Sequence, residues 1–265
     1  MNYLQATLLG LVQGLTEFLP VSSSGHLAIT QHYLPGFEQP GLLFDILLHL
    51  ATMGAVMIYF RRDIGLLLSS PWRRDAAGRD YRRLLVLIVV ASIPTGLIGL
   101  TFKDFFEGLF ENIPVVACML LVTGTLLWFA ERLTRAERPL SALNWRDALL
   151  TGIVQGLAVI PGISRSGSTI AVLLMRRVDG QSAARFSFLM SLPAIFGATL
   201  LSLRDLEAVQ AGQLGAYGVG MLVAFVSGLA AIHFLLALLR QKRLIFFALY
   251  CWVAGALFLG VSYFN

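Results

Sequence analysis

The stretch of sequence that decides the fold reads Gln13-Gly-Leu-Thr-Glu17-Phe-Leu-Pro-Val-Ser-Ser-Ser-Gly-His26. It lies within an apolar run, yet it carries a carboxylate, an amide, three serine hydroxyls and an imidazole. Hydrocarbon does not tolerate such groups unless they face one another, a cavity or a ligand. We therefore expect this stretch to line a buried polar site.

A second copy of this stretch lies 142 residues further on, as Gln155-Gly-Leu-Ala-Val-Ile-Pro-Gly-Ile-Ser-Arg-Ser-Gly-Ser168. Between positions 10 and 25, eight of sixteen residues are identical at this offset, and no gap is needed. The matches include Gln-Gly and Ser-x-Ser-Gly in register, whereas chance similarity of apolar segments gives scattered Leu and Val. The chain therefore contains an internal repeat.

The composition is that of an integral membrane protein. Of the 265 residues, 57% are hydrophobic and 13% are charged, whereas soluble domains have about 25% charged residues. The isoelectric point of about 9.6 does not indicate nucleic-acid binding, because the basic residues flank the apolar runs, as the positive-inside rule describes. Cys118 and Cys251 both lie inside apolar runs and predict neither a disulfide nor a metal cluster.

The apolar runs predict six complete membrane spans and two broken segments. The spans are expected at 42–60, 83–102, 114–131, 185–203, 215–239 and 244–264. The broken segments, 4–30 and 148–175, are interrupted by Pro and by Ser-x-Ser-Gly. Irregular backbone at membrane depth is tolerated only where it is buried or lines a cavity, so each broken segment could either cross the membrane or re-enter it.

The basic residues decide between crossing and re-entry. If both broken segments re-enter, seventeen of the twenty Lys and Arg residues lie on one side, and only Lys103 and Arg204 lie on the other. This partition predicts six spans, two re-entrant helical hairpins and both termini outside the cytoplasm.

Three spans per half make an inverted repeat. We expect an all-α fold of one domain, 1–265, with a first half at 1–142 and an inverted second half at 143–265. Such folds place their site at the midplane, where broken helices meet. The two Ser-x-Ser-Gly turns should therefore face each other. The sequence does not decide between a monomer and a homodimer.

The first copy supplies an acid. Gln13 and Glu17 are four residues apart and share a helix face. A carboxylate and an amide carbonyl suit Mg²⁺, or alternatively Ca²⁺, with phosphate oxygens of a substrate completing the shell. The simpler alternative is a buried hydrogen bond between these two side chains.

Both copies supply donors for an anion. Ser is a preferred N-cap, and Gly lets the backbone approach a ligand closely, and two helix N-termini at one cavity favour an anion. The second copy adds Arg165, whose planar fork suits phosphate oxygens; the alternative is a structural ion pair with Glu17. The expected phosphate-binding residues are Ser22, Ser24, Gly25, Ser164, Ser166, Gly167 and Thr169.

The histidines divide into two groups. His26 directly follows Ser-Gly and is a candidate base, acid or nucleophile. His233 and His49 are interpreted as structural. Asp45 lies four residues before His49 and either supports the site or begins a helix.

Two motifs together resemble a known family. Gln-x-x-x-Glu17 followed by Pro-Val-Ser-Ser-Ser-Gly-His26, and later Pro161-Gly-Ile-Ser-Arg-Ser-Gly-Ser-Thr169, are similar to the two signature motifs of bacterial undecaprenyl-diphosphate phosphatases, the bacitracin-resistance membrane family. The family has Glu or Gln at the position of Gln13. The resemblance covers nearly the whole chain. A weaker likeness to the other lipid phosphatase superfamily fails, because Ala171 stands where that superfamily requires His.

The resemblance implies an enzyme that removes the terminal phosphate of undecaprenyl diphosphate and so regenerates a carrier lipid for cell-wall synthesis. It implies functional roles for Glu17, Ser22, Ser23, His26, Ser164, Arg165 and Thr169. It also implies a location in the bacterial inner membrane, with the active site open toward the periplasm. The competing hypotheses are a lipid flippase or transporter built on the same inverted repeat, and a membrane binding module without catalysis.

The nucleophile has three candidates: a serine hydroxyl, the His26 imidazole and a metal-bound water. A metal-bound water ranks last, because Gln13 and Val159 replace carboxylates that it would need. We favour attack by Ser23 with His26 as its base, Arg165 clamping the phosphate, and Glu17 orienting His26 or holding a metal.

Overall fold

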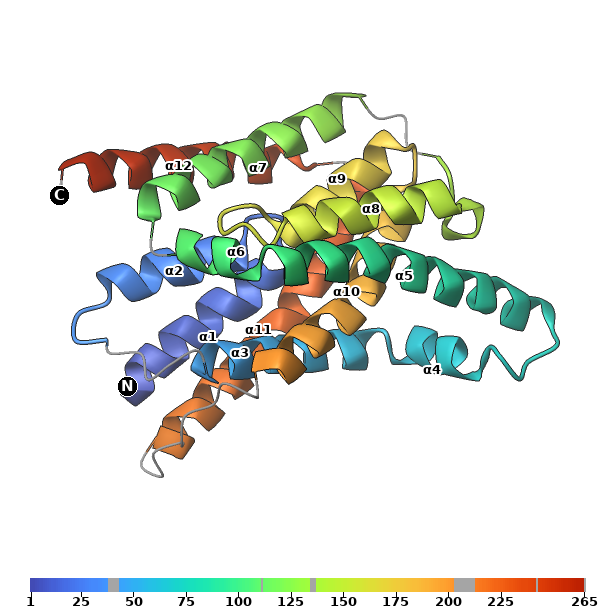
Figure 1. Cartoon of the computed structure of the whole chain (residues 1–265), viewed down its shortest axis with the longest axis horizontal. Helices are drawn as coiled ribbons and strands as arrows, with labels where there is room; N and C mark the ends of the chain where they lie inside the picture. Colours follow the sequence, from blue (N-terminus) through green and yellow to red (C-terminus); the bar gives the residue numbers. More distant parts are fainter. Residues whose placement is uncertain (38–42, 111, 134–136, 203–212, 242, 265) are drawn as a thin grey trace.

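The computed structural model describes residues 1–37, 43–110, 112–133, 137–202, 213–241 and 243–264 (Figure 1). Within these ranges the chain is helical, without strands, and one isolated bridge joins Arg138 to Val178. The helices are α1 (Tyr3–Phe18), α2 (Ser23–Tyr33), α3 (Leu43–Tyr59), α4 (Arg61–Ser69), α5 (Ala76–Thr101), α6 (Lys103–Leu109), α7 (Ile113–Leu133), η1 (Leu140–Ala142), α8 (Trp145–Leu157), α9 (Arg165–Met175), α10 (Gly180–Ser202), α11 (Leu214–Arg240) and α12 (Ile245–Phe264).

The long helices coincide with the predicted spans. Among the described residues, α5, α7, α10, α11 and α12 are each long and apolar enough to cross a membrane. The predicted span at 42–60 contains α3, which passes the same test only together with α4, across a bend of 79°. The chain is therefore a multi-pass helical membrane protein with five or six candidate spans.

Both predicted interruptions are present. In the first segment, α1 ends at Phe18 and α2 begins at Ser23; in the second, α8 ends at Leu157 and α9 begins at Arg165. Pro20 lies in the first break, where its ring cannot continue a helix. Gly162 lies in the second, with φ of +92°, a conformation that Gly adopts without penalty.

Each broken segment packs against a span from the other half of the sequence. Helix α1 lies along α11, and α8 lies along α5. Glycines permit this close approach: a Cβ atom on Gly10 would lie 2.3 Å from the carbonyl oxygen of Gly220, and one on Gly152 would lie 2.1 Å from that of Ala91. Small residues are the usual means by which helix backbones approach in membranes.

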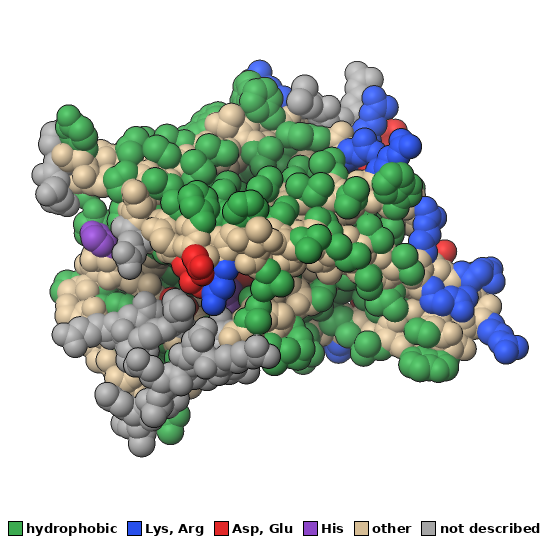
Figure 2. Space-filling view, viewed as in Figure 1, with side chains coloured by type: hydrophobic (Ala, Val, Ile, Leu, Met, Phe, Trp, Pro, Cys, Tyr) green, Lys and Arg blue, Asp and Glu red, His purple; other side chains and the backbone are tan. Residues whose placement is uncertain are grey.

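On the face shown in Figure 2, the surface between the two ends is mostly apolar, apart from one small group of acidic and basic side chains. Large apolar side chains on the spans remain exposed, among them Leu97, Leu222 and Val253, as expected for helices that face lipid tails. Lys and Arg side chains gather at the end where α4 and the start of α5 lie. The N-terminus and the end of α12 lie at the opposite end of the molecule (Figure 1).

Two ion clusters tie the arginine-rich end together. Asp147, at the start of α8, accepts hydrogen bonds from Arg138 at 2.7 Å and from Arg176 at 2.9 Å. Burial alone would raise the pKa of Asp147, but the hydrogen bonds from both arginines and from Asn144 hold that pKa below its usual value. The second cluster joins Arg185 of α10 to Asp63 and to the Tyr81 hydroxyl. The first cluster connects the two ends of the second broken segment, and the second connects α4, α5 and α10.

The close packing of α11 leads to a stability prediction. A Cβ atom on Gly220 would meet the buried Phe44 ring at 2.6 Å and the carbonyl oxygen of Ala6 at 3.0 Å, whereas one on Gly218 would meet nothing within 4 Å. Gly220→Ala should therefore destabilise the protein by about 1–3 kcal/mol, the usual range for overpacking. Gly218→Ala, on the same helix, should be neutral or slightly stabilising. Thermal unfolding of both variants in detergent compares them; equal melting temperatures would contradict the packing described.

Candidate active site

The buried carboxylate of Glu17 is the centre of the site. Glu17 lies in the last turn of α1, with only 4% of its surface exposed. Its Oε2 accepts a hydrogen bond from the Ser23 hydroxyl at 2.6 Å and one from the Gln13 amide at 3.1 Å. Its Oε1 pairs with the guanidinium of Arg165. The carboxylate thus joins both broken segments.

Two simpler alternatives raised by the sequence are present as contacts. The Gln13–Glu17 hydrogen bond forms, as the four-residue spacing allows. The ion pair between Glu17 and Arg165 also forms. Neither contact uses the full hydrogen-bonding capacity of its partners: Oε1 of Gln13 and Nη1 of Arg165 are buried and have no hydrogen-bond partner. Buried polar atoms without partners are uncommon in proteins, and each needs an explanation.

Both Ser-x-Ser-Gly turns cap helices. Ser22 is the N-cap of α2, and its hydroxyl accepts from the Gly25 amide at 3.3 Å. Ser164 is the N-cap of α9, and its hydroxyl accepts from the Gly167 amide at 3.0 Å. Ser22 has φ of +71°, a strained conformation for a residue with a side chain. Such strain is commonly kept at functional sites.

The two turns touch each other, as predicted. A Cβ atom on Gly25 would lie 3.1 Å from Cα of Gly162, and one on Gly167 would lie 3.1 Å from Cβ of Pro20. The two glycines therefore allow the turns to approach each other, whereas the sequence predicted that they allow a ligand to approach the backbone. Figure 1 shows the two connections together near the middle of the bundle.

Besides the two N-cap serines, the other three expected phosphate-binding hydroxyls are also engaged within the protein. Ser24 lies 3.3 Å from the Ser22 hydroxyl. Ser166 donates to the carbonyl oxygen of Leu19 at 3.2 Å. Thr169 contacts the Arg165 carbonyl and the hydroxyl of Ser187. A substrate would have to displace these contacts to reach the hydroxyls, so their role as phosphate ligands stays a prediction.

The predicted pairing of Ser23 with His26 is not what the structure contains. The Ser23 hydroxyl donates to Glu17. The His26 ring instead contacts the Ser22 carbonyl oxygen through Nδ1 at 2.8 Å and the hydroxyl of Tyr250 through Nε2 at 2.7 Å. Three-residue spacing on a helical turn puts the two side chains near each other. Glu17 orients the serine, however, and Ser22 and Tyr250 orient the histidine. The group placed to accept the serine proton is therefore Glu17.

His49 belongs to the site, although the sequence indicated a structural residue. Its Nε2 lies 3.8 Å from Oε2 of Glu17, and its Nδ1 contacts the carbonyl oxygen of Asp45. The carboxylate of Asp45 lies in the first turn of α3 and accepts from Gln31 at 2.7 Å. The four-residue spacing between Asp45 and His49 thus reflects a backbone contact. His233 contacts Tyr59 away from the site, at 3.3 Å.

Further contacts come from helices that the motifs do not include. Thr123 of α7 donates to the carbonyl oxygen of Gly162 and accepts from the amide of Ser164, both at 3.0 Å. Thr52 of α3 lies 3.5 Å from the Gln13 amide. A polar residue within an apolar span is the only signal of such contacts in the sequence, and it does not say which turn the residue supports.

The residues around Glu17 can offer only part of a metal site. Among the described residues no group of three or more His, Cys, Asp and Glu side chains is placed to hold an ion. The oxygen donors at hand are Glu17 and the unpartnered Oε1 of Gln13. Mg²⁺ is commonly bound by one or two carboxylates, with waters and substrate phosphates as the other ligands. The donor set fits that pattern when a phosphate is present.

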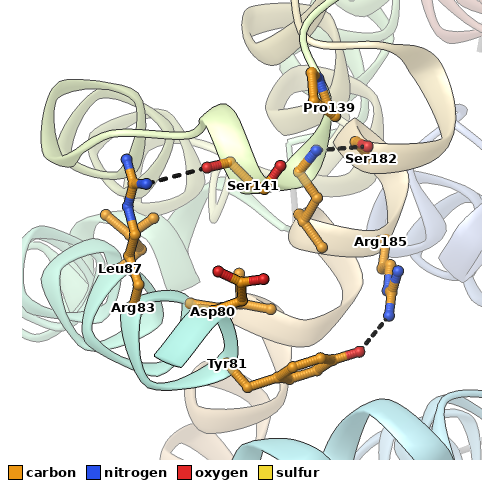
Figure 3. Close-up of a pocket in the computed structure, with 10 residues that line it drawn as sticks. Asp80, Tyr81, Arg83, Leu87, Pro139, Ser141, Ser182 and Arg185 are labelled. Atoms are coloured by element: carbon orange, nitrogen blue, oxygen red, sulfur yellow. Dashed lines mark hydrogen bonds between the residues drawn. The ribbon is translucent and has the colours of Figure 1, made fainter. Parts of the chain in front are cut away.

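A separate cavity of about 330 Å³ opens at the arginine-rich end, between α5, η1 and α10 (Figure 3). Its two guanidinium groups are already engaged: Arg83 donates to the carbonyl oxygens of Ser141 and Leu143, and Arg185 to Tyr81 and Asp63. Asp80 also lines the cavity. Nε of Arg185 is buried and has no hydrogen-bond partner, but neither broken segment contributes a side chain to this cavity.

Fold and site together define a multi-pass membrane protein with a buried, charged centre made from two broken helical segments. Residues 6–257 match the family described as bacitracin resistance protein BacA, and the chain belongs to this family. Similar curated proteins are named undecaprenyl-diphosphatase. One from Syntrophotalea carbinolica is 55% identical over 99% of this chain and 100% of its own length. One from Alkaliphilus metalliredigens is 43% identical over 97% and 98%, and one from Methanobrevibacter smithii is 40% identical over 98% of each chain.

Proposed function

We propose that this protein is a hydrolase that removes the terminal phosphate of undecaprenyl diphosphate and leaves undecaprenyl phosphate. Family membership supports this activity, as do the relatives named for it. The observation that carries the proposal is that Ser23 and Arg165 both contact the buried carboxylate of Glu17. It combines a nucleophile, a base and a phosphate-binding cation.

Arg165 is proposed to clamp the diphosphate. Its guanidinium is planar and binds phosphate oxygens through two parallel hydrogen bonds. In the free protein it pairs with Glu17 while its Nη1 has no partner. A bound diphosphate would take over the guanidinium and place positive charge where the transferring phosphoryl group develops negative charge. Glu17 would then be released from its ion pair.

Ser23 is proposed as the nucleophile and Glu17 as its base. The serine oxygen attacks the terminal phosphorus, the phosphoanhydride bond breaks, and undecaprenyl phosphate leaves. The serine proton passes through Glu17 to the leaving phosphate. A water molecule, deprotonated by Glu17, then hydrolyses the phosphoserine, and Ser23 recovers a proton. The hydrogen bond of 2.6 Å from Ser23 to Glu17 supports this assignment; His26 as the nucleophile is the alternative.

A divalent ion, most simply Mg²⁺, is proposed to bind with the substrate. Gln13 and Glu17 would hold it together with phosphate oxygens. When bound, such an ion neutralises charge on the diphosphate. The unpartnered Oε1 of Gln13 supports the proposal.

An inverted repeat of two halves, 1–142 and 143–265, is proposed to underlie this site. The exchanged packing of α1 on α11 and of α8 on α5 supports it. So do the two N-caps, Asn2 and Asn144, which form capping boxes at the same 142-residue offset. The arginine-rich end would face the cytoplasm, both termini would lie outside, and the site would open toward the periplasm.

The activity is tested by phosphate release. Purified protein in detergent should release inorganic phosphate from a long-chain prenyl diphosphate, more slowly after EDTA treatment and again at the full rate after Mg²⁺ is added. Arg165→Lys keeps the charge and loses the fork, so its turnover should fall at least about 100-fold, as for loss of one preorganised donor. A melting temperature near that of the wild type shows that the variant folds.

Two results would contradict this scheme. Near-normal turnover of Arg165→Lys would make Arg165 structural or peripheral. Absence of phosphate release by the folded wild-type protein would favour a lipid carrier or binding protein instead.

The nucleophile is tested with Ser23→Ala. This variant should lose nearly all turnover while still binding the lipid diphosphate, which equilibrium binding with a fluorescent analogue measures. Retention of more than about a tenth of the rate, a change of less than about 1.4 kcal/mol in the barrier, would make Ser23 a ligand. His26 would then be the better candidate.

The orientation is tested by cysteine labelling in a background without Cys118 and Cys251. A cysteine in place of Asp75 should react with a membrane-impermeant reagent only from the cytoplasmic side. A cysteine in place of Asp104 should react only from the periplasmic side. The reverse pattern would overturn the proposed topology.

A further inference from the structure

His26 has a partner that neither sequence motif contains. Tyr250 lies on α12, 224 residues further along the chain, and its hydroxyl is 2.7 Å from Nε2 of His26. The two rings are nearly parallel, at 14°, with their centres 5.6 Å apart. We propose that Tyr250 is a positioning residue, which fixes the orientation and tautomer of His26 for the proposed phosphatase reaction.

The hydrogen bonds of the imidazole define its tautomer. Nδ1 lies 2.8 Å from the carbonyl oxygen of Ser22, which can only accept, so Nδ1 carries the proton. In the neutral ring Nε2 is then an acceptor, and the Tyr250 hydroxyl donates to it. Which nitrogen of a histidine is protonated is set by the hydrogen bond that the other nitrogen makes. Tyr250 and Ser22 together bind both ring nitrogens of His26.

The position of Tyr250 is itself fixed against the first break. The next residue, Cys251, is fully buried, and its Sγ lies 3.7 Å from the carbonyl oxygen of Pro20. Helix α12 also packs along α7, whose Thr123 supports the second turn. The backbone of α12 at Tyr250 is therefore held directly against the first break and, through α7, beside the second. The Tyr250 side chain is about half-exposed, so its contact with His26 is what holds the hydroxyl in place.

The relation to Ser23 gives this contact a function. Ser22 offers its carbonyl oxygen to His26, and the following residue, Ser23, offers its hydroxyl to Glu17. The imidazole and the proposed nucleophile therefore leave the same strained turn in different directions. Without Tyr250 the ring would keep only its backbone contact. It could then turn toward Ser23 or away from the phosphate.

Tyr250→Phe is the direct test, because it keeps the ring and removes only the hydroxyl. Turnover should fall about 5- to 50-fold, while KM should change less than about 3-fold, because the substrate contacts stay and the orientation of His26, the alternative nucleophile, is lost. The matched control is Tyr59→Phe, which removes the hydroxyl from the other tyrosine–histidine hydrogen bond among the described residues, that of Tyr59 with His233. That variant should keep wild-type turnover.

A spectroscopic readout separates positioning from a structural role. The protein has four histidines, so ¹⁵N-histidine labelling gives few ring signals, and loss of a signal in His26→Ala assigns His26. In the wild type His26 should be protonated at Nδ1; in Tyr250→Phe its Nε2 signal should shift or divide between tautomers. Tyr59→Phe should leave it unchanged.

Two results would overturn the proposal. One is unchanged turnover in Tyr250→Phe. The other is reduced turnover with an unaltered His26 signal, which would make Tyr250 a packing residue. The spectroscopic measurement does not depend on catalysis, so a failure of the wild-type protein to release phosphate would refute the proposed function and leave the tautomer test standing.

Discussion

The ion pair between Glu17 and Arg165 is the interaction on which the rest of the structure depends. Each residue lies in a broken segment inside an apolar bundle, where an unpaired charge is expensive. Removing one partner of a buried pair commonly destabilises a protein by about 3–5 kcal/mol, because the other charge is left uncompensated. The two breaks must therefore meet. For them to meet, α1 and α8 must each pack against a span from the opposite half, which the glycines at 10 and 152 permit.

The same pair has to open for the proposed reaction. A guanidinium that clamps a diphosphate through two parallel hydrogen bonds needs Nη2, which pairs with Oε1 of Glu17, as well as the unpartnered Nη1, so substrate binding and the ion pair compete. The ion pair itself compensates both charges at membrane depth. The competition couples phosphate binding to the release of Glu17, which is already hydrogen-bonded to the Ser23 hydroxyl at 2.6 Å.

The sequence predicted the features that local residue pattern controls. The long apolar runs gave the spans, and the Pro, Gly and Ser residues gave the two breaks and their N-caps, because these features act over a few residues. The sequence did not predict the orientation of His26, since the positive φ of Ser22 and a partner 224 residues away decide it. Nor did it predict the place of His49 beside Glu17 or the Thr123 contact with the second turn. Those contacts depend on how α3 and α7 pack, which spacing within one motif cannot report.

The distribution of unsatisfied polar atoms gives the last argument for a ligand. Among the described residues five buried side-chain atoms lack a hydrogen-bond partner, and four of them lie in the two broken segments, on Gln13, Gln155, Arg165 and Ser168. Folding normally eliminates such atoms, since each costs about 1–3 kcal/mol. Two of the four, on Gln13 and Arg165, belong to side chains that contact Glu17 directly. One is an oxygen suited to a cation and the other a nitrogen suited to a phosphate, which is the pair of partners that a metal-bound diphosphate would supply.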